Sequence, residues 1–369
     1  MKILITLTLI ILSMFSYLRS EEDKTYKIDI DSKGVKTFYN KNIPADPNFK
    51  IELKQIGEIT SDYLDSLGAP KFMVLDFDCD KDGNIIILDY NLMWKFSRTG
   101  RFIKKWARQG NGPGELTNPF HFYIFDNTIN VLNSPNIIKF NDEGKFICNI
   151  LIKFFSDYPS NIFSVSNNFL LGSKEYYNVE TKRKADKIVM YDPKDFKVIK
   201  TLFEREYKKK GSMFSYDDIL LYAGNEKVFF VVDNSYDEYK IDCYDSKTGK
   251  MKYKIRKNHI RVKNDEIVKD HFGVAPGGEK IKIQTGTSKF KEAINEIFYD
   301  QYDRLWVNPN SRDIDEEEDG MYFDIFKDGV FQNRLRFDMN FTSINCFKLN
   351  RNKIIEYEKG GNTYIYEFK

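Results

Sequence analysis

The sequence predicts an all-β fold, a six-bladed β-propeller whose ring is closed by an N-terminal strand that completes the last blade. Three observations lead to this prediction. Short apolar runs of β type alternate with Gly- and Asp-rich turns along most of the chain. The resulting four-strand pattern recurs at intervals near the roughly 40–50 residues of a propeller blade. The count of strands leaves the last unit one strand short and the N-terminal region one strand in excess.

The clearest repeat runs from Met73 to Glu115. Tight turns at Cys79–Asn84 and Ser97–Gly100 separate its strands, and the glycine-rich linker Arg108–Glu115 leads to the next unit. Short strands joined by such turns predict an antiparallel four-stranded meander. The predicted strands are Met73–Asp78, Ile85–Leu88, Leu92–Phe96 and Phe102–Trp106.

Four more units of four strands follow, and a sixth unit has only three. The four complete units are Phe120–Ile150, Ile162–Phe203, Asp218–Arg256 and Ala293–Phe337. The predicted strands of the sixth are Ser343–Leu349, Lys353–Tyr357 and Thr363–Phe368. The segment Phe49–Gly57 alternates apolar and polar residues and has no hairpin partner beside it. We expect it to pair with Thr363–Phe368, which closes the ring and gives one propeller domain over residues 49–369.

An insertion at residues 257–289 lengthens the interval between the fourth and fifth units. It contains the glycines Gly273, Gly277 and Gly278 and a segment, Asn264–Phe272, that favours one short helix. We expect the insertion to lie over one mouth of the central channel as a flap.

Composition limits the classes of function. The 369 residues include 31 Phe and 23 Tyr, which suits pleated sheets. Lys and Arg total 57 against 55 Asp and Glu, so the charge balance gives no case for nucleic-acid binding. The four cysteines are scattered without a CxxC pair, so neither a zinc ribbon nor a thioredoxin-type site is expected. We expect four unpaired thiols, with one disulfide as the alternative.

The N-terminus predicts export. Lys2 precedes the apolar run Ile3–Leu12, and charged residues follow from Glu21. This arrangement is typical of a secretory signal peptide, assigned here to residues 1–20. Roughly 16 helical residues span about 24 Å, which is less than a bilayer core of about 30 Å and favours a cleaved signal over a membrane span. A retained signal anchor is the alternative. We expect a periplasmic or extracellular protein without a stable membrane span after cleavage, and residues 21–48 as an extended lead-in.

Parts of the sequence resemble a known group of propellers. Asp80–Asp89 resembles the strand-turn-strand signature of NHL-type repeats, and Lys95–Lys104 resembles the second hairpin of the same repeat. Gln109–Glu115 is similar to the Gly-x-Gly-Pro-Gly-Glu linker of six-bladed propellers common among exported bacterial proteins, and Gly34–Pro44 resembles their lead-in. The third to fifth units lack the Asp-Gly-Asn turn, so their assignment as blades rests on periodicity. The resemblance implies a fold but almost no chemistry.

Asp78, Asp80 and Asp82 match the first half of a calcium-binding loop. The flanking segments are strands, which excludes an EF-hand. Carboxylates at alternate positions of a hairpin can still converge on a hard cation, so a structural Ca²⁺ is one interpretation. The other is an ordinary turn in which Asp and Asn accept hydrogen bonds from their own backbone. We expect the turn, with no cofactor.

The remaining candidates are aromatic and imidazole side chains on the face that carries the long loops between blades. They are His121, Tyr176, Tyr177, His259 and His271. The histidines have no metal-ligand spacing, and no Gly-x-Ser-x-Gly elbow marks a serine hydrolase. The glycines of Gln109–Glu115 precede a strand rather than a helix, so they favour a tight crossing between blades over nucleotide binding.

Two functions stay open at this point. The first is an exported, non-enzymatic binding or scaffold propeller that engages a protein, peptide or glycan through its loop-bearing face. The second is a metal-dependent hydrolase or lyase with a divalent cation bound in the channel. A propeller fold hosts both kinds of function, so the fold does not choose between them.

Overall fold

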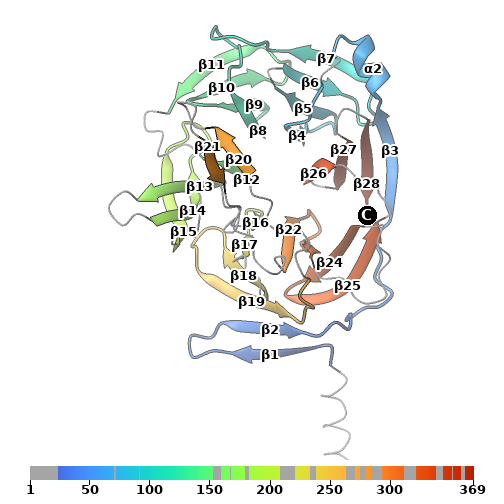
Figure 1. The fold of residues 1–369 in the computed structure, drawn as a ribbon, viewed down its shortest axis with the longest axis vertical. Coiled ribbons are helices and arrows are strands. Elements are labelled where there is room, and N and C mark those ends of the chain that lie inside the picture. Colours follow the sequence, from blue (N-terminus) through green and yellow to red (C-terminus); the bar gives the residue numbers. More distant parts are fainter. Residues whose placement is uncertain are drawn as a thin grey trace, which may run out of the picture.

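The computed structural model describes residues 24–69, 72–90, 92–152, 159–166, 168–178, 183–207, 221–232, 238–262, 271–274, 280–283, 293–310, 321–337, 344–350, 352–358 and 362–369. Within these ranges, six sheets of four or more strands stand around a central channel, as Figure 1 shows. The prediction of an all-β, six-bladed propeller is confirmed.

Each blade begins with its innermost strand and proceeds outward by antiparallel pairing. Blade one contains β4 (Asp76–Cys79), β5 (Ile85–Asp89), β6 (Leu92–Phe96) and β7 (Phe102–Trp106). Blade two contains β8 (Pro119–Phe125), β9 (Thr128–Asn133), β10 (Asn136–Asn141) and β11 (Phe146–Leu151). Blade three contains β12 (Asn161–Val165), β13 (Leu170–Asn178), β14 (Arg183–Tyr191) and β15 (Val198–Tyr207).

The second half of the ring repeats this order. Blade four contains β16 (Leu221–Gly224), β17 (Val228–Val232), β18 (Tyr239–Asp245) and β19 (Met251–Lys257). Blade five contains β22 (Ile294–Tyr299), β23 (Arg304–Pro309), β24 (Met321–Lys327) and β25 (Val330–Phe337). Blade six contains β26 (Ile344–Asn350), β27 (Lys353–Glu358) and β28 (Thr363–Phe368).

The fourth strand of blade six comes from the other end of the chain. β3 (Leu53–Ile59) pairs antiparallel with β28, from Ile59 opposite Thr363 to Leu53 opposite Phe368. The predicted closure is therefore confirmed, with the paired strand beginning a few residues later than expected. A short helix that the sequence analysis did not predict, α2 (Ser61–Ser66), follows β3.

The hydrophobic core is divided among the joints between blades. Six clusters of buried side chains occur in the described residues, one at each of the six joints. Ile85 and Ile87 belong to the cluster between blades six and one, whereas Ile86 and Leu88 belong to the cluster between blades one and two. Because successive side chains of a strand point to opposite faces, β5 fills two clusters and is apolar throughout.

Glycine allows the blades to approach one another closely. A Cβ at Gly57 would lie 2.5 Å from the backbone C of Thr99, and a Cβ at Gly100 would lie 2.4 Å from the backbone O of Glu58. Gly57 and Glu58 belong to β3, and Thr99 and Gly100 to the outer turn of blade one. At the joint between blades six and one, each blade therefore contributes a glycine where the two backbones come closest.

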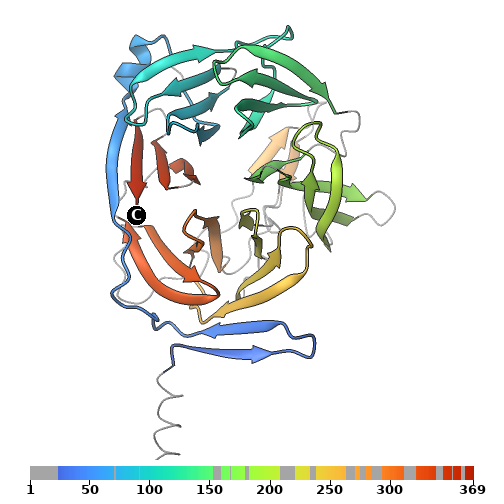
Figure 2. The ribbon, with the colours of Figure 1, turned by 180° about the vertical axis from the view of Figure 1, so that it is seen from behind.

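Residues 21–48 were expected to form an extended lead-in, and the structure pairs part of them with blade four. β1 (Tyr26–Ile30) and β2 (Lys36–Asn40) form an antiparallel hairpin, and β2 pairs in parallel with β19. Figures 1 and 2 show this hairpin on the outside of the ring. The sequence does not predict this pairing, because nothing local marks a partner strand as distant as Tyr253 is from Lys36.

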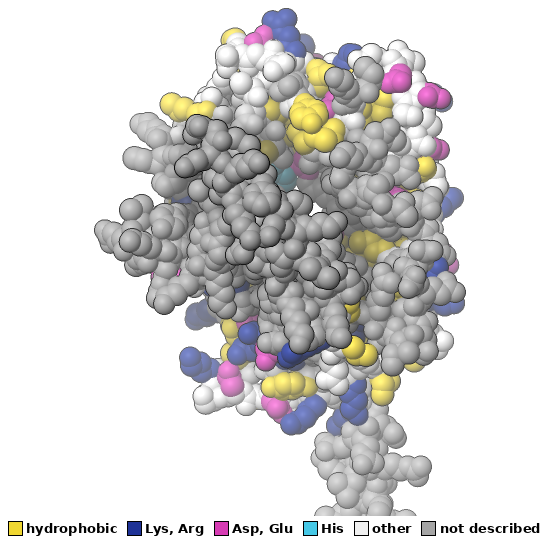
Figure 3. Space-filling model, viewed as in Figure 1, with side chains coloured by type: hydrophobic (Ala, Val, Ile, Leu, Met, Phe, Trp, Pro, Cys, Tyr) yellow, Lys and Arg dark blue, Asp and Glu magenta, His cyan; other side chains and the backbone are white. Residues whose placement is uncertain are grey.

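Buried polar contacts fasten the hairpin to blade five. The side chain of Asn40 accepts a hydrogen bond from the backbone N–H of Phe331 at 2.9 Å and donates one to the carbonyl of Gly329 at 3.1 Å. A Cβ on Gly329 would lie 2.6 Å from the ring of Phe38. The hairpin thus packs against the outer turn of blade five at the joint between blades four and five. β3 packs against the outer turn of blade one in the same way. Figure 3 shows Lys and Arg side chains beside Asp and Glu along this lower edge.

The structure describes only parts of the insertion at 257–289. β20 (His271–Val274) pairs antiparallel with β21 (Lys280–Ile283). The helix expected at Asn264–Phe272 is wrong at its end, because His271 and Phe272 belong to β20, and residues 264–270 lie outside the described residues. The hairpin is drawn near in Figure 1 and faint in Figure 2, so it lies toward one face of the ring. Its action as a flap stays a prediction.

Three of the four cysteines are free thiols. Cys79, Cys148 and Cys243 form no disulfide, and Cys346 has no described side chain. Cys79 and Cys243 are buried, and burial raises the pKa of the Cys243 thiol to about 12. These two thiols fill core positions as small apolar groups.

Closure predicts that Gly57→Val destabilises the protein. The added side chain meets backbone atoms of Thr99, which cannot rotate away, and overpacking of this kind costs about 1–3 kcal/mol. Urea denaturation followed by tryptophan fluorescence measures the loss. Lys54→Val, on the exposed side of the same strand, is the control and is expected to change stability by about 0.5 kcal/mol or less. Equal midpoints for the two variants would contradict the assigned contact.

Candidate functional site

The innermost strands surround a central channel of about 1210 Å³. Its described lining comes from β4, β8, β12, β16 and β22 and from the turns that follow these strands. The lining combines aromatic surface with charged groups, as expected for a ligand site rather than for a filled core. Aromatic residues in the lining include Phe120, Phe163, Tyr222, Phe298 and Tyr299.

Asp76 and His121 connect the inner strands of three blades. The carboxylate of Asp76 on β4 contacts Nδ1 of His121 on β8 and accepts a hydrogen bond from the backbone N–H of Phe122 at 2.9 Å. Nε2 of His121 lies 2.8 Å from the carbonyl oxygen of Ile162 on β12. Both side chains are buried. The Asp76–His121 pair therefore holds blades one, two and three together at the channel wall.

The geometry also determines how many protons this pair holds. Both ring nitrogens of His121 face oxygen atoms, but a neutral imidazole carries only one N–H. A second proton is therefore shared between Nδ1 and the carboxylate of Asp76. Burial lowers the pKa of His121 to about 4, against the opposing effects of the Ile162 carbonyl and the Asp78 charge. Both ring nitrogens face protein oxygens, so neither is available to a ligand.

The other predicted ligand residues do not join His121 in the described channel lining. His259 follows β19 and is half-buried, and it is not part of that lining. His271 lies on β20, and Tyr176 and Tyr177 lie near the end of β13 opposite Ala185 and Lys184. The side chains of His271 and both tyrosines are outside the described residues, so their role stays a prediction.

The three aspartates of the proposed calcium loop have different environments. Asp78 lies in the channel lining, and Asp82 is exposed at the tip of the turn. Asp80 is buried, and one of its oxygens accepts hydrogen bonds from the backbone N–H groups of Asp82 and Asn84, both at 2.9 Å. Its other oxygen accepts from the Asn84 amide at 3.0 Å and pairs with Lys95 at 2.7 Å. These contacts support the interpretation as a turn.

The donors around Asp80 also determine its charge. The described residues contain no group of three or more His, Cys, Asp and Glu side chains that could hold a metal ion. Burial acts to raise the pKa of Asp80, but hydrogen bonds from Lys95 and Asn84 outweigh burial and hold the pKa below its usual value of 3.8. Asp80 is therefore ionised at neutral pH and already has donors around both oxygens.

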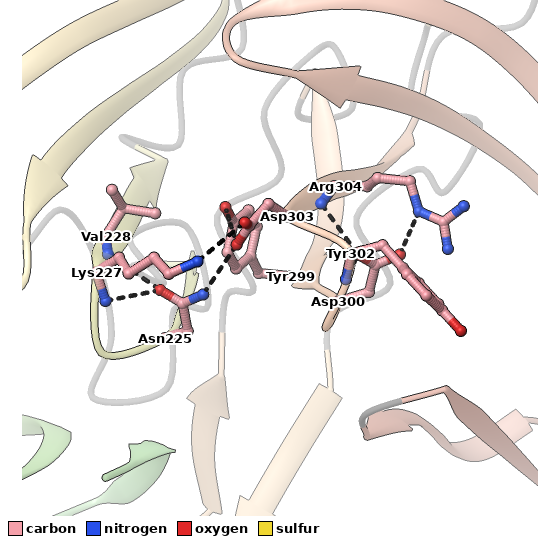
Figure 4. A network of polar contacts seen from close by, with 8 residues as sticks. All are labelled: Asn225, Lys227, Val228, Tyr299, Asp300, Tyr302, Asp303 and Arg304. Carbon is pink, nitrogen blue, oxygen red and sulfur yellow. Dashed lines mark hydrogen bonds and ion pairs between the residues drawn. The ribbon is translucent and has the colours of Figure 1, made fainter. Parts of the chain in front are cut away.

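Two turn networks at one end of the channel were not predicted from the sequence. Asp303 accepts from Lys227 at 3.1 Å and from the Asn225 amide and the Tyr299 hydroxyl, each at 3.3 Å, so it joins the turns of blades four and five (Figure 4). Asp300 repeats the pattern of Asp80. It accepts from the backbone N–H of Arg304 and pairs with its guanidinium at 2.6 Å.

Glu296 is the channel residue that the sequence analysis missed most clearly. It lies on β22, is half-buried, and belongs to the channel lining. Burial raises the pKa of its carboxyl group to about 7. The only sequence signal is a charged residue between apolar neighbours in a predicted inner strand, and that signal does not say which way the side chain points.

The family comparison agrees with this architecture. A model of the DUF5128 family, described as a 6-bladed beta-propeller, matches residues 78–270, more than half of the chain. The chain belongs to this family. No curated protein matches the sequence.

Solved structures resemble this DUF5128 propeller at low identity. A candidate exported protein of Bacteroides fragilis is 12% identical, with a TM-score of 0.55 over 90% of this chain and 99% of the other. A DUF4221 member from Bacteroides vulgatus is also 12% identical, with a TM-score of 0.49 over 87% and 98%. Virginiamycin B lyase from Staphylococcus aureus, with quinupristin, is 12% identical, with a TM-score of 0.43 over 86% and 99%. The likeness to the Bacteroides fragilis protein supports the propeller fold and nothing further.

No helix in the part of the chain that the structure describes is long and apolar enough to cross a membrane.

The hydrogen bonds of Asp80 predict that calcium leaves the thermal midpoint of unfolding unchanged. Thermal melts in millimolar Ca²⁺ and in chelator measure this, because an ion bound only to the folded state would raise stability. A calcium-dependent rise that Asp80→Asn abolishes would instead establish a site.

The same variant has a predicted pH dependence. Since the pKa of Asp80 is lowered by folding, its ionised form stabilises the protein above about pH 4, and this contribution is lost as pH falls through the folded pKa. Asp80→Asn is expected to be less stable than the wild type at pH 7, with the difference shrinking toward pH 3. A difference that does not change with pH would contradict the ionic role.

Asp76→Asn tests the connection between the first three blades. Its amide can donate to Nδ1 of His121 only by turning its N–H₂ group toward the ring, which leaves the buried N–H of Phe122 without an acceptor. An unsatisfied buried group costs about 1–3 kcal/mol, measured by urea denaturation. Asp82→Asn makes the same chemical change at an exposed position and is expected to stay within about 0.5 kcal/mol of the wild type. Equal losses of stability in the two variants would contradict the proposed role of Asp76 in connecting the three blades.

Proposed function

We propose that this DUF5128 propeller is an exported, non-enzymatic binding protein that holds a peptide or glycan in its central channel, entered from a propeller face. The observation that carries the proposal is the open channel of about 1210 Å³ with aromatic and charged side chains in its lining. Concave sites that combine apolar and aromatic surface with convergent polar groups are the usual form of ligand sites. The predicted signal peptide at residues 1–20 supports export.

The channel wall is already ordered before any ligand arrives. Ser173 on β13 donates to the hydroxyl of Tyr222 on β16 at 2.5 Å, and the ring of Tyr222 lies 4.8 Å from that of Phe163. The Asp76–His121 pair and the Lys227–Asp303 ion pair hold other parts of the wall. A site whose side chains are held in this way loses little conformational entropy on binding.

The competing function is a metal-dependent hydrolase or lyase. It requires ligands that converge on a divalent cation, and the described residues contain no such group. Elemental analysis of the purified protein separates the two functions. About one tightly held Ca²⁺ or Zn²⁺ per chain would favour the enzyme.

Blocking the channel tests the binding function. Asn161 lies on β12 in the channel lining and is half-buried, so Asn161→Trp places a large side chain in the ligand space. Screening the wild-type protein against peptide and glycan panels identifies a ligand, and titration calorimetry then compares the variants. We expect Asn161→Trp to weaken binding about tenfold or more, since about 1.4 kcal/mol corresponds to a factor of ten.

Asn258→Trp is the matched control, because Asn258 is exposed and lies outside the channel lining. It is expected to bind as the wild type does. Equal affinity of both variants for every ligand found would place the site elsewhere and contradict the proposal.

A further inference from the structure

Glu296 differs from the other carboxylates discussed above. Asp76, Asp80, Asp300 and Asp303 each contact protein donors, as described above. The carboxylate of Glu296 has no hydrogen bond or ion pair with any residue that the structure describes. It stands half-buried in the wall of the channel. A carboxylate removed from bulk water without a partner gains free energy when a cation or donor reaches it.

The surroundings of Glu296 favour a cation over a neutral donor. Burial raises the pKa of its carboxyl group to about 7, and no positive charge among the described residues contributes to this shift. The described channel lining also contains more acidic than basic side chains. The carboxylates are Asp76, Asp78, Asp126, Glu226, Glu296, Asp300 and Asp303, and the lysines are Lys81 and Lys227. Asp300 pairs with Arg304 and Asp303 pairs with Lys227, but the other lining carboxylates still outnumber Lys81, and such an excess attracts positively charged ligands.

Aromatic side chains in the same channel can hold the apolar part of such a ligand. Phe298 lies two residues from Glu296 on β22 and therefore on the same face of that strand, whereas Tyr299 points to the opposite face. Tyr222 belongs to the channel lining on β16, the neighbouring inner strand. Aromatic rings attract cations by their faces and bury methylene groups by their area. A charged head with an aliphatic chain therefore matches both parts of this surface.

We propose that Glu296 is the anchor for a primary ammonium group carried on an aliphatic chain, bound in the central channel. A lysine side chain of a peptide and a free diamine share this chemistry. The inference rests on the proposed binding function and names the ligand class of that site. Ammonium donors pair with the carboxylate, and the alkyl chain lies against the aromatic side chains.

Titration calorimetry on the full chain tests the anchor with two pairs of probes. One pair is 1,5-diaminopentane and its neutral analogue 1,5-pentanediol. The other is acetyl-Gly-Lys-Gly-amide and the same peptide with an acetylated lysine amine. We expect one or both ammonium probes to bind and both neutral probes to bind at least about tenfold more weakly, since the neutral probes lose the charge-assisted hydrogen bonds to the carboxylate. Which ammonium probe binds distinguishes a free amine from a peptide.

Glu296→Gln keeps the shape of the side chain and removes its charge. It is expected to weaken ammonium binding about tenfold or more. Because the unpaired buried charge is gone, the variant is expected to melt at the same temperature as the wild type or higher, which shows that it folds. Glu226→Gln makes the same change at an exposed position of the channel mouth and is expected to alter affinity by about threefold or less.

The pH profile provides an independent readout. The carboxyl group must be ionised to pair with the ammonium, whose own pKa is about 10.4. Affinity should therefore rise from pH 6 to pH 8 in the wild type and stay flat in Glu296→Gln. Absence of ammonium binding, or equal losses in Glu296→Gln and Glu226→Gln, would overturn the inference. If a glycan or neutral peptide still binds and Asn161→Trp blocks it, the binding function stands and only the ammonium anchor fails.

Discussion

The pairing of β3 with β28 is the interaction on which the rest of the structure depends. A propeller without it would be an open arc with two apolar blade faces and a free strand edge. The pairing covers the outer edge of β28 with Leu53–Ile59 and brings Ile59 into the core between blades six and one. Because β3 and β28 lie at opposite ends of the propeller sequence, no joint depends on a single covalent connection. The channel exists because this ring is closed.

Closure works only because neighbouring blades meet in the same way around the ring. At the closing joint, β3 approaches the outer turn of blade one at glycine positions on both sides. Lysines support equivalent turns farther along. Lys139 and Lys200 donate to carbonyl oxygens in the outer turns of blades three and four, at 2.9 and 2.8 Å. Between blades four and five the N-terminal hairpin makes this contact, so the lead-in extends the same construction.

The distribution of hydrogen-bond donors separates structural carboxylates from a candidate functional one. Asp80 and Asp300 are enclosed by their own turns, and Asp76 shares a proton with His121. These groups are satisfied by the fold, so a ligand would have to displace existing contacts. The carboxylate of Glu296, in contrast, is half-buried and has no partner among the described residues. The difference between them is one of environment, since all four are carboxylates near the inner strands.

The sequence by itself determined the class of fold, the number of blades and the closing strand. These properties follow from local signals, since strand alternation, Gly and Asp turns and the spacing of repeats are all visible in short windows. It did not reveal the pairing of β2 with β19, the helix α2 or the place of Glu296 in the channel wall. The pairing joins strands that are distant in the chain. The environment of a side chain in the channel depends on residues that several blades contribute. His121 was singled out as a ligand residue, but only the tertiary structure shows Asp76 and Ile162 at its two nitrogens. Residues from three blades meet there because the ring is closed, and no single stretch of sequence contains that information.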